Sequence, residues 1–133
     1  MNSAKTAANR NDIQSSFSIL LAESNSILRE KIAGLLTRQE KVWCVVQVSG
    51  REELLRGAAN IQPDFILASV SILNDQETID SLKNSAPSCR IIALAESVSD
   101  PYREAITRLG LEDVIETTAV SDFFTNVFIG LET

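Results

Sequence analysis

The chain has 133 residues, a length that suits one domain with one hydrophobic core. Hydrophobic residues make up 44% of it and charged residues 23%, as in ordinary globular proteins, and the formal net charge is −6. Phosphate backbones and anionic membrane surfaces repel such an acidic chain, so we expect this domain to bind neither nucleic acid nor a membrane directly. The sequence contains no apolar run of the roughly 18 residues that a membrane span needs.

The cysteine and histidine content narrows the possible chemistry. Two cysteines, Cys44 and Cys89, are too few for a disulfide scaffold, and we expect both to be small hydrophobic residues in a reducing cytoplasm. The absence of histidine removes imidazole metal ligands and histidine general bases. No phosphate loop, dinucleotide fingerprint or metal-ligand spacing is present, so we expect no cofactor, no metal site and no enzymatic activity.

Strand-like runs divide the chain after a polar start. Residues 1–16 are small and polar, and we expect a disordered tail there, followed by a single domain over residues 17–133. Short apolar runs rich in β-branched residues predict strands over 17–22, 42–48, 64–70, 90–95 and 113–116.

Amphipathic segments separate these strands. Helical spacing of apolar residues predicts helices over 26–39, 50–61, 77–85, 101–109 and 120–131. Asn25 or Ser26 can cap the first of them. Gly110 is expected just past the end of the fourth.

Five strands that alternate with helices predict an α/β fold, a doubly wound parallel sheet with helices on both faces. Near-continuous apolar strands agree, because such strands are buried on both sides. In open sheets of this kind ligands bind beyond the carboxyl ends of the strands. Here those ends place residues after Ala22, around Ser69, after Ala95 and around Thr117 at one edge.

Several segments resemble the receiver domain of bacterial two-component response regulators, over roughly residues 17–131. "SILLAESNSILREKIAGLL" is similar to the first strand, acidic pair and first helix of that family, and "QPDFILASVSI" to its phosphoacceptor strand. "RIIALAE" and "LGLEDVIETT" are similar to its fourth and fifth strands. Within the family, the sequence is most similar to regulators with a C-terminal helix-turn-helix output. The resemblance implies a flavodoxin-like (CheY-like) sheet in the order 2-1-3-4-5, with the first and fifth helices on one face.

The family's phosphorylation site is largely missing when it is carried over residue by residue. Its acidic pair falls on Glu23 and Ser24, and its acceptor aspartate on Ser69. Its hydroxyl position falls on Ala95 and its lysine on Thr117. The resemblance therefore implies a degenerate phosphoacceptor pocket.

Such a pocket is poorly suited to phosphoryl transfer. Mg²⁺ prefers an octahedral oxygen site that includes carboxylates, and Glu96 or Asp113 would have to assist the one that is left. The developing phosphoryl charge has no fixed cation without the lysine. Ser69 as a nucleophile would need a general base, for which only Glu23 is a candidate.

Three functions follow from this comparison. The favoured one is a pseudo-receiver, a phosphorylation-independent signalling and interaction module that regulates transcription through an output domain or a partner protein. The second is a phosphorylation-dependent regulator with rewired ligands. The third is a small-ligand sensor that uses the vacated pocket.

Candidate interface residues lie in the second half of the chain. Phe123 widens the apolar stripe of the last helix on one side, and Ile129 lies on the opposite side of the helix, which predicts a homodimer contact or docking of an output domain. The family's aromatic switch position falls on Val114, and Tyr102 near a helix start is a further candidate.

Two other features are expected to be structural. We expect Trp43, on an edge strand, to be partly buried, with a partner contact as the alternative. Residues 29–31 are expected to form a solvated helix face.

Overall fold

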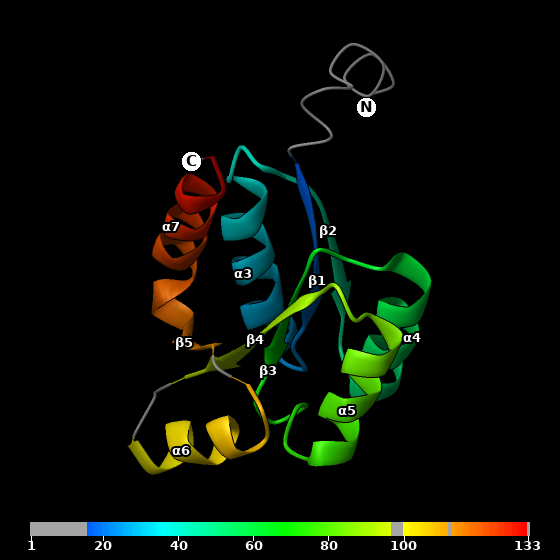
Figure 1. Ribbon diagram of the computed structural model, residues 1–133. Coiled ribbons are helices and arrows are strands. Elements are labelled where there is room, and N and C mark those ends of the chain that lie inside the picture. The colour runs from blue at the N-terminus through cyan, green and yellow to red at the C-terminus, as the bar shows by residue number, and fades with distance from the viewer. Residues whose placement is uncertain (1–15, 97–99, 112, 133) are drawn as a thin grey trace.

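The computed structural model describes residues 16–96, 100–111 and 113–132 (Figure 1). The predicted tail lies outside these residues, apart from Ser16. The elements in chain order are β1 (Phe17–Ala22), α3 (Ser26–Thr37), β2 (Val42–Val48), α4 (Arg51–Ile61), β3 (Phe65–Ser69), α5 (Gln76–Ser85), β4 (Arg90–Ala95), α6 (Asp100–Arg108), β5 (Asp113–Glu116), the 3-10 turn η1 (Thr117–Ala119) and α7 (Val120–Glu132).

All five strands pair in parallel in the order β2-β1-β3-β4-β5, which confirms the predicted sheet. β1 and β3 are in register from Ile19 with Phe65 to Ala22 with Ala68. β3 continues in register with β4 up to the pair of Ser69 and Leu94. The chain order reverses between β1 and β3, so this is the switch point of the sheet, where ligands bind in folds of this type.

Helices cover both faces of the sheet (Figure 1). One core cluster joins the sheet to α3 and α7, and a second joins it to α4, α5 and α6. β3 is buried along its whole length, which explains its continuous apolar sequence "FILAS". The predicted assignment of helices to faces is therefore confirmed.

Local signals fix several element ends. The Asn25 side chain accepts a hydrogen bond from the N–H of Leu28 at 3.0 Å, so Asn25 caps α3 and Ser26 lies inside the helix. α3 ends at Thr37, two residues earlier than predicted, because the chain turns there and the Gln39 N–H bonds to the Leu36 carbonyl. Gly110 has φ 94°, a left-handed conformation that favours glycine just past a helix.

A cluster of phenylalanine rings holds α7 on the sheet. Neighbouring rings among Phe17, Phe65, Phe124 and Phe128 have their centroids 5.2 to 5.9 Å apart. Phe124 is fully buried, while its neighbour Phe123 is half-buried. Aromatic contacts of this kind stabilise a core beyond the area they bury.

We therefore expect Phe124→Ala to lower the free energy of unfolding by about 3–5 kcal/mol, because it leaves a cavity where no water can enter. Phe123→Ala, the matched control one residue away, should cost clearly less. Urea denaturation of both variants measures the difference. Equal losses for the two would contradict the assignment of Phe124 to the centre of the core.

Candidate functional site

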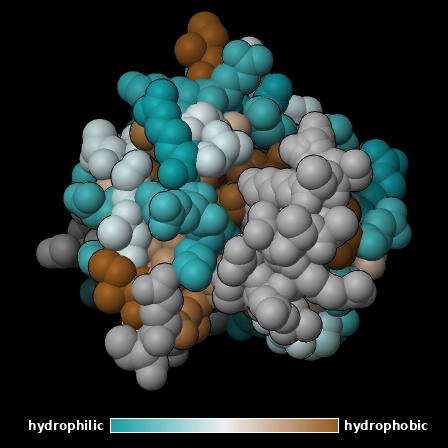
Figure 2. Space-filling model, turned by 90° about the horizontal axis from the view of Figure 1, so that it is seen from above, coloured by the Kyte–Doolittle hydropathy of each residue, from teal (hydrophilic) through white to brown (hydrophobic). Residues whose placement is uncertain are grey.

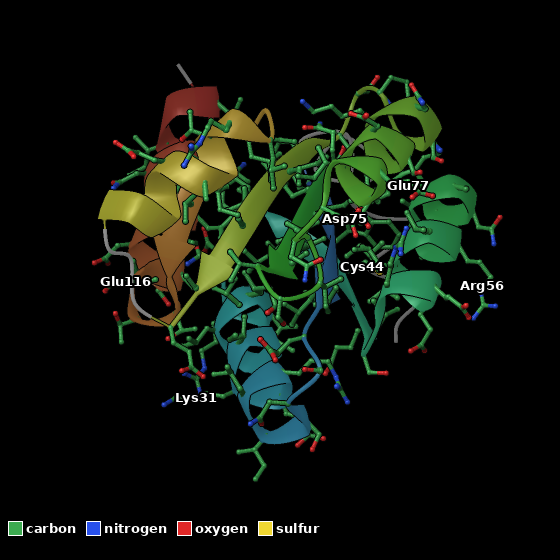
Figure 3. The ribbon with its side chains drawn as sticks, turned by 90° about the horizontal axis from the view of Figure 1, so that it is seen from below. Lys31, Cys44, Arg56, Asp75, Glu77 and Glu116 are labelled. Atoms are coloured by element: carbon green, nitrogen blue, oxygen red, sulfur yellow. The ribbon has the colours of Figure 1, made fainter. Side chains whose placement is uncertain are left out.

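The five residues of the predicted pocket all lie at the carboxyl edge of the sheet. Glu23 and Ser24 follow β1, Ser69 ends β3, Ala95 ends β4 and Thr117 follows β5 in η1. The shared register brings these strand ends to one level. Figure 3 views the molecule from below, with Glu116 at the end of β5 and Asp75 beside the start of α5.

Glu23 is buried and fixed by hydrogen bonds of both its side chain and its backbone. Its side chain is 7% exposed, and its Oε2 accepts a hydrogen bond from the Asn25 N–H at 2.9 Å. The Glu23 N–H donates to the Val48 carbonyl at 3.1 Å, at the end of β2. The one acidic side chain of the predicted pocket is therefore engaged in shaping the turn that leads into α3.

Arg29 completes this arrangement, and the sequence did not predict it. Its Nη1 donates to the Glu23 carbonyl oxygen at 2.8 Å, and the residue is half-buried rather than part of a solvated face. The correction has a simple cause: Arg29 lies about one helical turn after the cap of α3, on the side that faces back to β1. That spacing was visible in the sequence, but the partner is a main-chain oxygen, which no sequence pattern reveals.

Ser69 is likewise engaged with a near neighbour. It is 8% exposed, and its hydroxyl lies 2.8 Å from the hydroxyl of Ser71. Its Oγ also accepts from the Ser71 N–H at 3.3 Å. Among the described residues no hydrogen bond joins Ser69 to Glu23, so a base that could activate this hydroxyl is not positioned there.

The remaining positions contribute little charge. Ala95 is 2% exposed and packs in the core, and Thr117 is half-buried in the 3-10 turn. Ser24 is exposed on the turn after β1. None of these three side chains can carry a charge, so they supply neither a carboxylate nor a cation at this end of the sheet.

The two carboxylates considered as helpers differ in position. Asp113 is the first residue of β5, so it lies at the amino end of its strand and not at the carboxyl end with the pocket residues. Its oxygens accept from the Arg90 guanidinium at 2.8 and 3.1 Å. This ion pair raises the pKa of Arg90, chiefly through its hydrogen bond to Asp113. Asp113 therefore cannot assist the pocket, while Glu96 follows β4 at the correct edge and is exposed.

Asp75 is a further carboxylate on this side of the molecule, and it is committed to helix capping. It accepts a hydrogen bond from the Thr78 N–H at 2.7 Å at the start of α5. That bond is the main cause of the lowered pKa of Asp75. In the described part of the chain, no three acidic, cysteine or histidine residues lie close enough to hold a metal ion. The side chains at this end of the sheet fit Mg²⁺ poorly, because they offer one carboxylate, which already accepts from the Asn25 N–H, and otherwise neutral hydroxyls.

Cys89 is poorly suited to act as a nucleophile. Burial raises the pKa of Cys89 to about 12, so it stays a neutral thiol at physiological pH. Both cysteines are free and half-buried, and Cys89 packs against the core.

Known proteins resemble the chain in sequence and in fold. No family model matches it. The chain is 29% identical over 93 residues to the nitrate/nitrite response regulator protein NarL of Escherichia coli K12, a match that covers 68% of this chain and 42% of NarL. The chain thus spans less than half the length of the curated relatives it matches.

Solved structures match over most of the chain. The non-phosphorylated receiver domain of the Escherichia coli stress response regulator RcsB superimposes with a TM-score of 0.73 at 18% identity, over 88% of this chain and 93% of that one. The chain has the fold of response-regulator receiver domains. A response regulator from Burkholderia pseudomallei with a phosphorylated aspartic acid superimposes with a TM-score of 0.69 at 20% identity, over 83% of this chain and 65% of that one. RcsB from Salmonella typhimurium gives 0.73 at 17% identity, over 89% of this chain and 60% of that one.

The geometry of this receiver fold predicts that two substitutions are enough to create a cation site. Ser24→Asp together with Ser69→Asp would add two carboxylates beside Glu23, and we expect the double variant to bind Mg²⁺ in the millimolar range or more tightly. Titration calorimetry of wild type and variant measures this gain. A control with the same added charge, Thr37→Asp with Thr125→Asp, places it at exposed sites elsewhere and should bind no better than wild type. Equal binding by all three proteins would contradict the placement of these residues.

Proposed function

We propose that this receiver domain is a pseudo-receiver, a signalling and interaction module that works without phosphorylation. The observation that carries the proposal is the state of the pocket: the hydroxyl of Ser69 bonds to Ser71, and the carboxylate of Glu23 bonds to the Asn25 N–H. Phosphoryl transfer needs a nucleophile, a cation and a fixed positive charge at the same point. The carboxyl edge of this sheet offers none of these in a ready position.

The exposed end of α7 supports docking of another protein surface. Ile129 is 57% and Leu131 58% exposed, and Figure 2 shows apolar side chains at the lower left, over the end of α7. Large apolar side chains left exposed at a helix end are a common sign of a protein contact. We assign this surface to a partner protein or an output domain.

The other interface candidates have different surroundings. Phe123 is half-buried, with its ring centroid 5.3 Å from that of Phe124 and 5.4 Å from the Arg90 guanidinium. Val114 is 5% exposed within the core, so it presents no surface to a partner, because its side chain points to the helix-covered face of β5. The side chain of Tyr102 lies outside the described residues.

The biological role of the module is proposed from its relatives. RcsB from Salmonella typhimurium has been described for its conformational dynamism in DNA interaction, and another similar structure is a LuxR-family response regulator. We propose that this domain regulates transcription through an attached or associated output, in the cytoplasm. Its net charge of −6 supports contact with protein rather than with DNA itself. None of the described helices is both long and apolar enough to cross a bilayer.

The proposal predicts that small phosphoryl donors do not modify the chain. After incubation with acetyl phosphate and Mg²⁺, intact-protein mass spectrometry should show the unmodified mass for wild type and for Ser69→Ala. The Ser69→Ala variant should also keep its regulatory activity, because it loses one hydrogen bond worth about 1 kcal/mol. A phosphorylated wild type that becomes unmodified in Ser69→Ala would show a rewired site instead.

A further inference from the structure

The two edges of the sheet are protected very differently. β5 is short, begins and ends with a carboxylate, and is tied to β4 by the ion pair of Asp113 with Arg90. β2 at the other edge has seven residues, "VWCVVQV", with no charge and no proline (Figure 1). Charged residues and prolines are the usual means by which proteins keep an edge strand from pairing.

The side chains of β2 are also poorly covered. Trp43 is 57% exposed, which contradicts the expected partial burial and favours the alternative of a partner contact. The cause is a register shift beside it: Phe17 pairs with Val42, but Ser18 pairs with Cys44, so Trp43 is an extra residue in the strand. The next residues of β2 stay half-buried or exposed, whereas β3 is buried throughout.

Some backbone N–H and C=O groups of β2 lie on its open side, in the plane of the sheet and facing away from β1. The Val48 carbonyl accepts from the Glu23 N–H and therefore faces β1. Because successive residues of a strand face opposite ways, the N–H and C=O of Val45 and of Gln47 face outward, as does the Trp43 carbonyl. No described residue pairs with them.

We propose that β2 pairs with β2 of a second copy of this chain, antiparallel about Val45. In this register Val45 lies opposite Val45 of the second copy, and their N–H and C=O groups bond to one another. The Gln47 N–H of each copy then reaches the Trp43 carbonyl of the other. The outward-facing groups of one strand are thus the complement of the same groups in the opposite direction, which is the requirement for a twofold interface.

The flanks of the strand are complementary in charge. Lys41 precedes β2, and Ser49 follows it, with its hydroxyl donating to the Glu53 carboxylate at 2.7 Å. The proposed pairing sets Lys41 opposite Ser49 of the second copy. Each lysine therefore approaches the Glu53 carboxylate of the other chain, and symmetry repeats the contact at both ends.

The pairing closes after two chains. It joins the two sheets into one and leaves only the two β5 edges, which their carboxylates protect. The contact covers one strand and one tryptophan from each copy, an area typical of weak association, so it must be measured at high protein concentration. The surface is separate from the end of α7 and does not depend on the proposed pseudo-receiver role.

A pair of single-cysteine variants tests the register directly. The native cysteines are first removed by Cys44→Ser and Cys89→Ala. At a protein concentration of about 100 μM, well above the dissociation constant of a tight dimer, Val45→Cys in this background should form a disulfide-linked dimer under mild oxidation by diamide. Residues opposite each other in a hydrogen-bonded antiparallel pair have Cα atoms about 5.5 Å apart, within disulfide range. Gln47→Cys is the matched control: its copies lie on opposite sides of the symmetry axis and should stay largely monomeric. Equal crosslinking of the two, or none for Val45→Cys, overturns the proposal.

Sedimentation of proteins with no added cysteine gives the second measurement. Wild type at about 100 μM should contain dimer, and Val45→Pro should shift it to monomer while it stays folded by circular dichroism, because this proline removes only an outward N–H. Trp43→Lys should act in the same direction and serves if the proline variant does not fold. Ile129→Glu, on α7, should leave the dimer intact. A monomeric wild type, or a dimer lost with Ile129→Glu but kept in Val45→Pro and Trp43→Lys, would show that β2 is not the interface.

Discussion

Parallel pairing of β1, β3 and β4 is the constraint on which the rest of this molecule depends. These strands carry almost only apolar side chains from Ile19 to Ala22, from Phe65 to Ser69 and from Ile91 to Ala95, and nearly all are buried. A strand buried on both faces has its register set by packing on each side, since a slip by one residue would exchange its two faces. The level at which the strands end is therefore fixed by the core and does not depend on the residues that follow.

This independence is what the proposed pseudo-receiver role requires, because residues at the strand ends can differ while the sheet stays the same. Glu23, which follows β1, and Ser69, which ends β3, occupy their places because these two strands are buried, and their side chains do not set the register. In this chain Glu23 and Ser69 have local hydrogen-bond partners in Asn25, Arg29 and Ser71. A ligand that bound there would have to break these hydrogen bonds and replace them with its own.

Much of the fold could be predicted from the sequence because its signals are local. Four of the five strands have the predicted bounds, and the cap at Asn25 and the turn at Gly110 follow from short-range chemistry. The order of the strands came from the resemblance, since periodicity alone cannot give it. The positions of the five pocket residues followed once each strand end was known.

What could not be predicted depends on contacts between distant segments or on irregular backbone. Trp43 is exposed because of a register shift that no residue pattern announces. Asp113 lies at the start of a strand, so its partner Arg90 and its distance from the pocket follow from the β4–β5 register. Arg29 was expected in solvent because its charge suggested that environment, yet a main-chain oxygen binds it.

The central claim is that the pocket carries no phosphorylation-dependent switch, and the NMR response to a phosphoryl mimic tests it most directly. Beryllofluoride with Mg²⁺ attaches to an acceptor carboxylate and stands in for the phosphoryl group. We expect the ¹H–¹⁵N spectrum of the wild-type chain to stay unchanged on its addition, since Ser69 offers no carboxylate and the donor set does not fit the cation. A receiver with an intact acceptor aspartate serves as the positive control. Shifts that spread from Ser69 to the end of β4 and to η1 in the wild-type chain would contradict the claim.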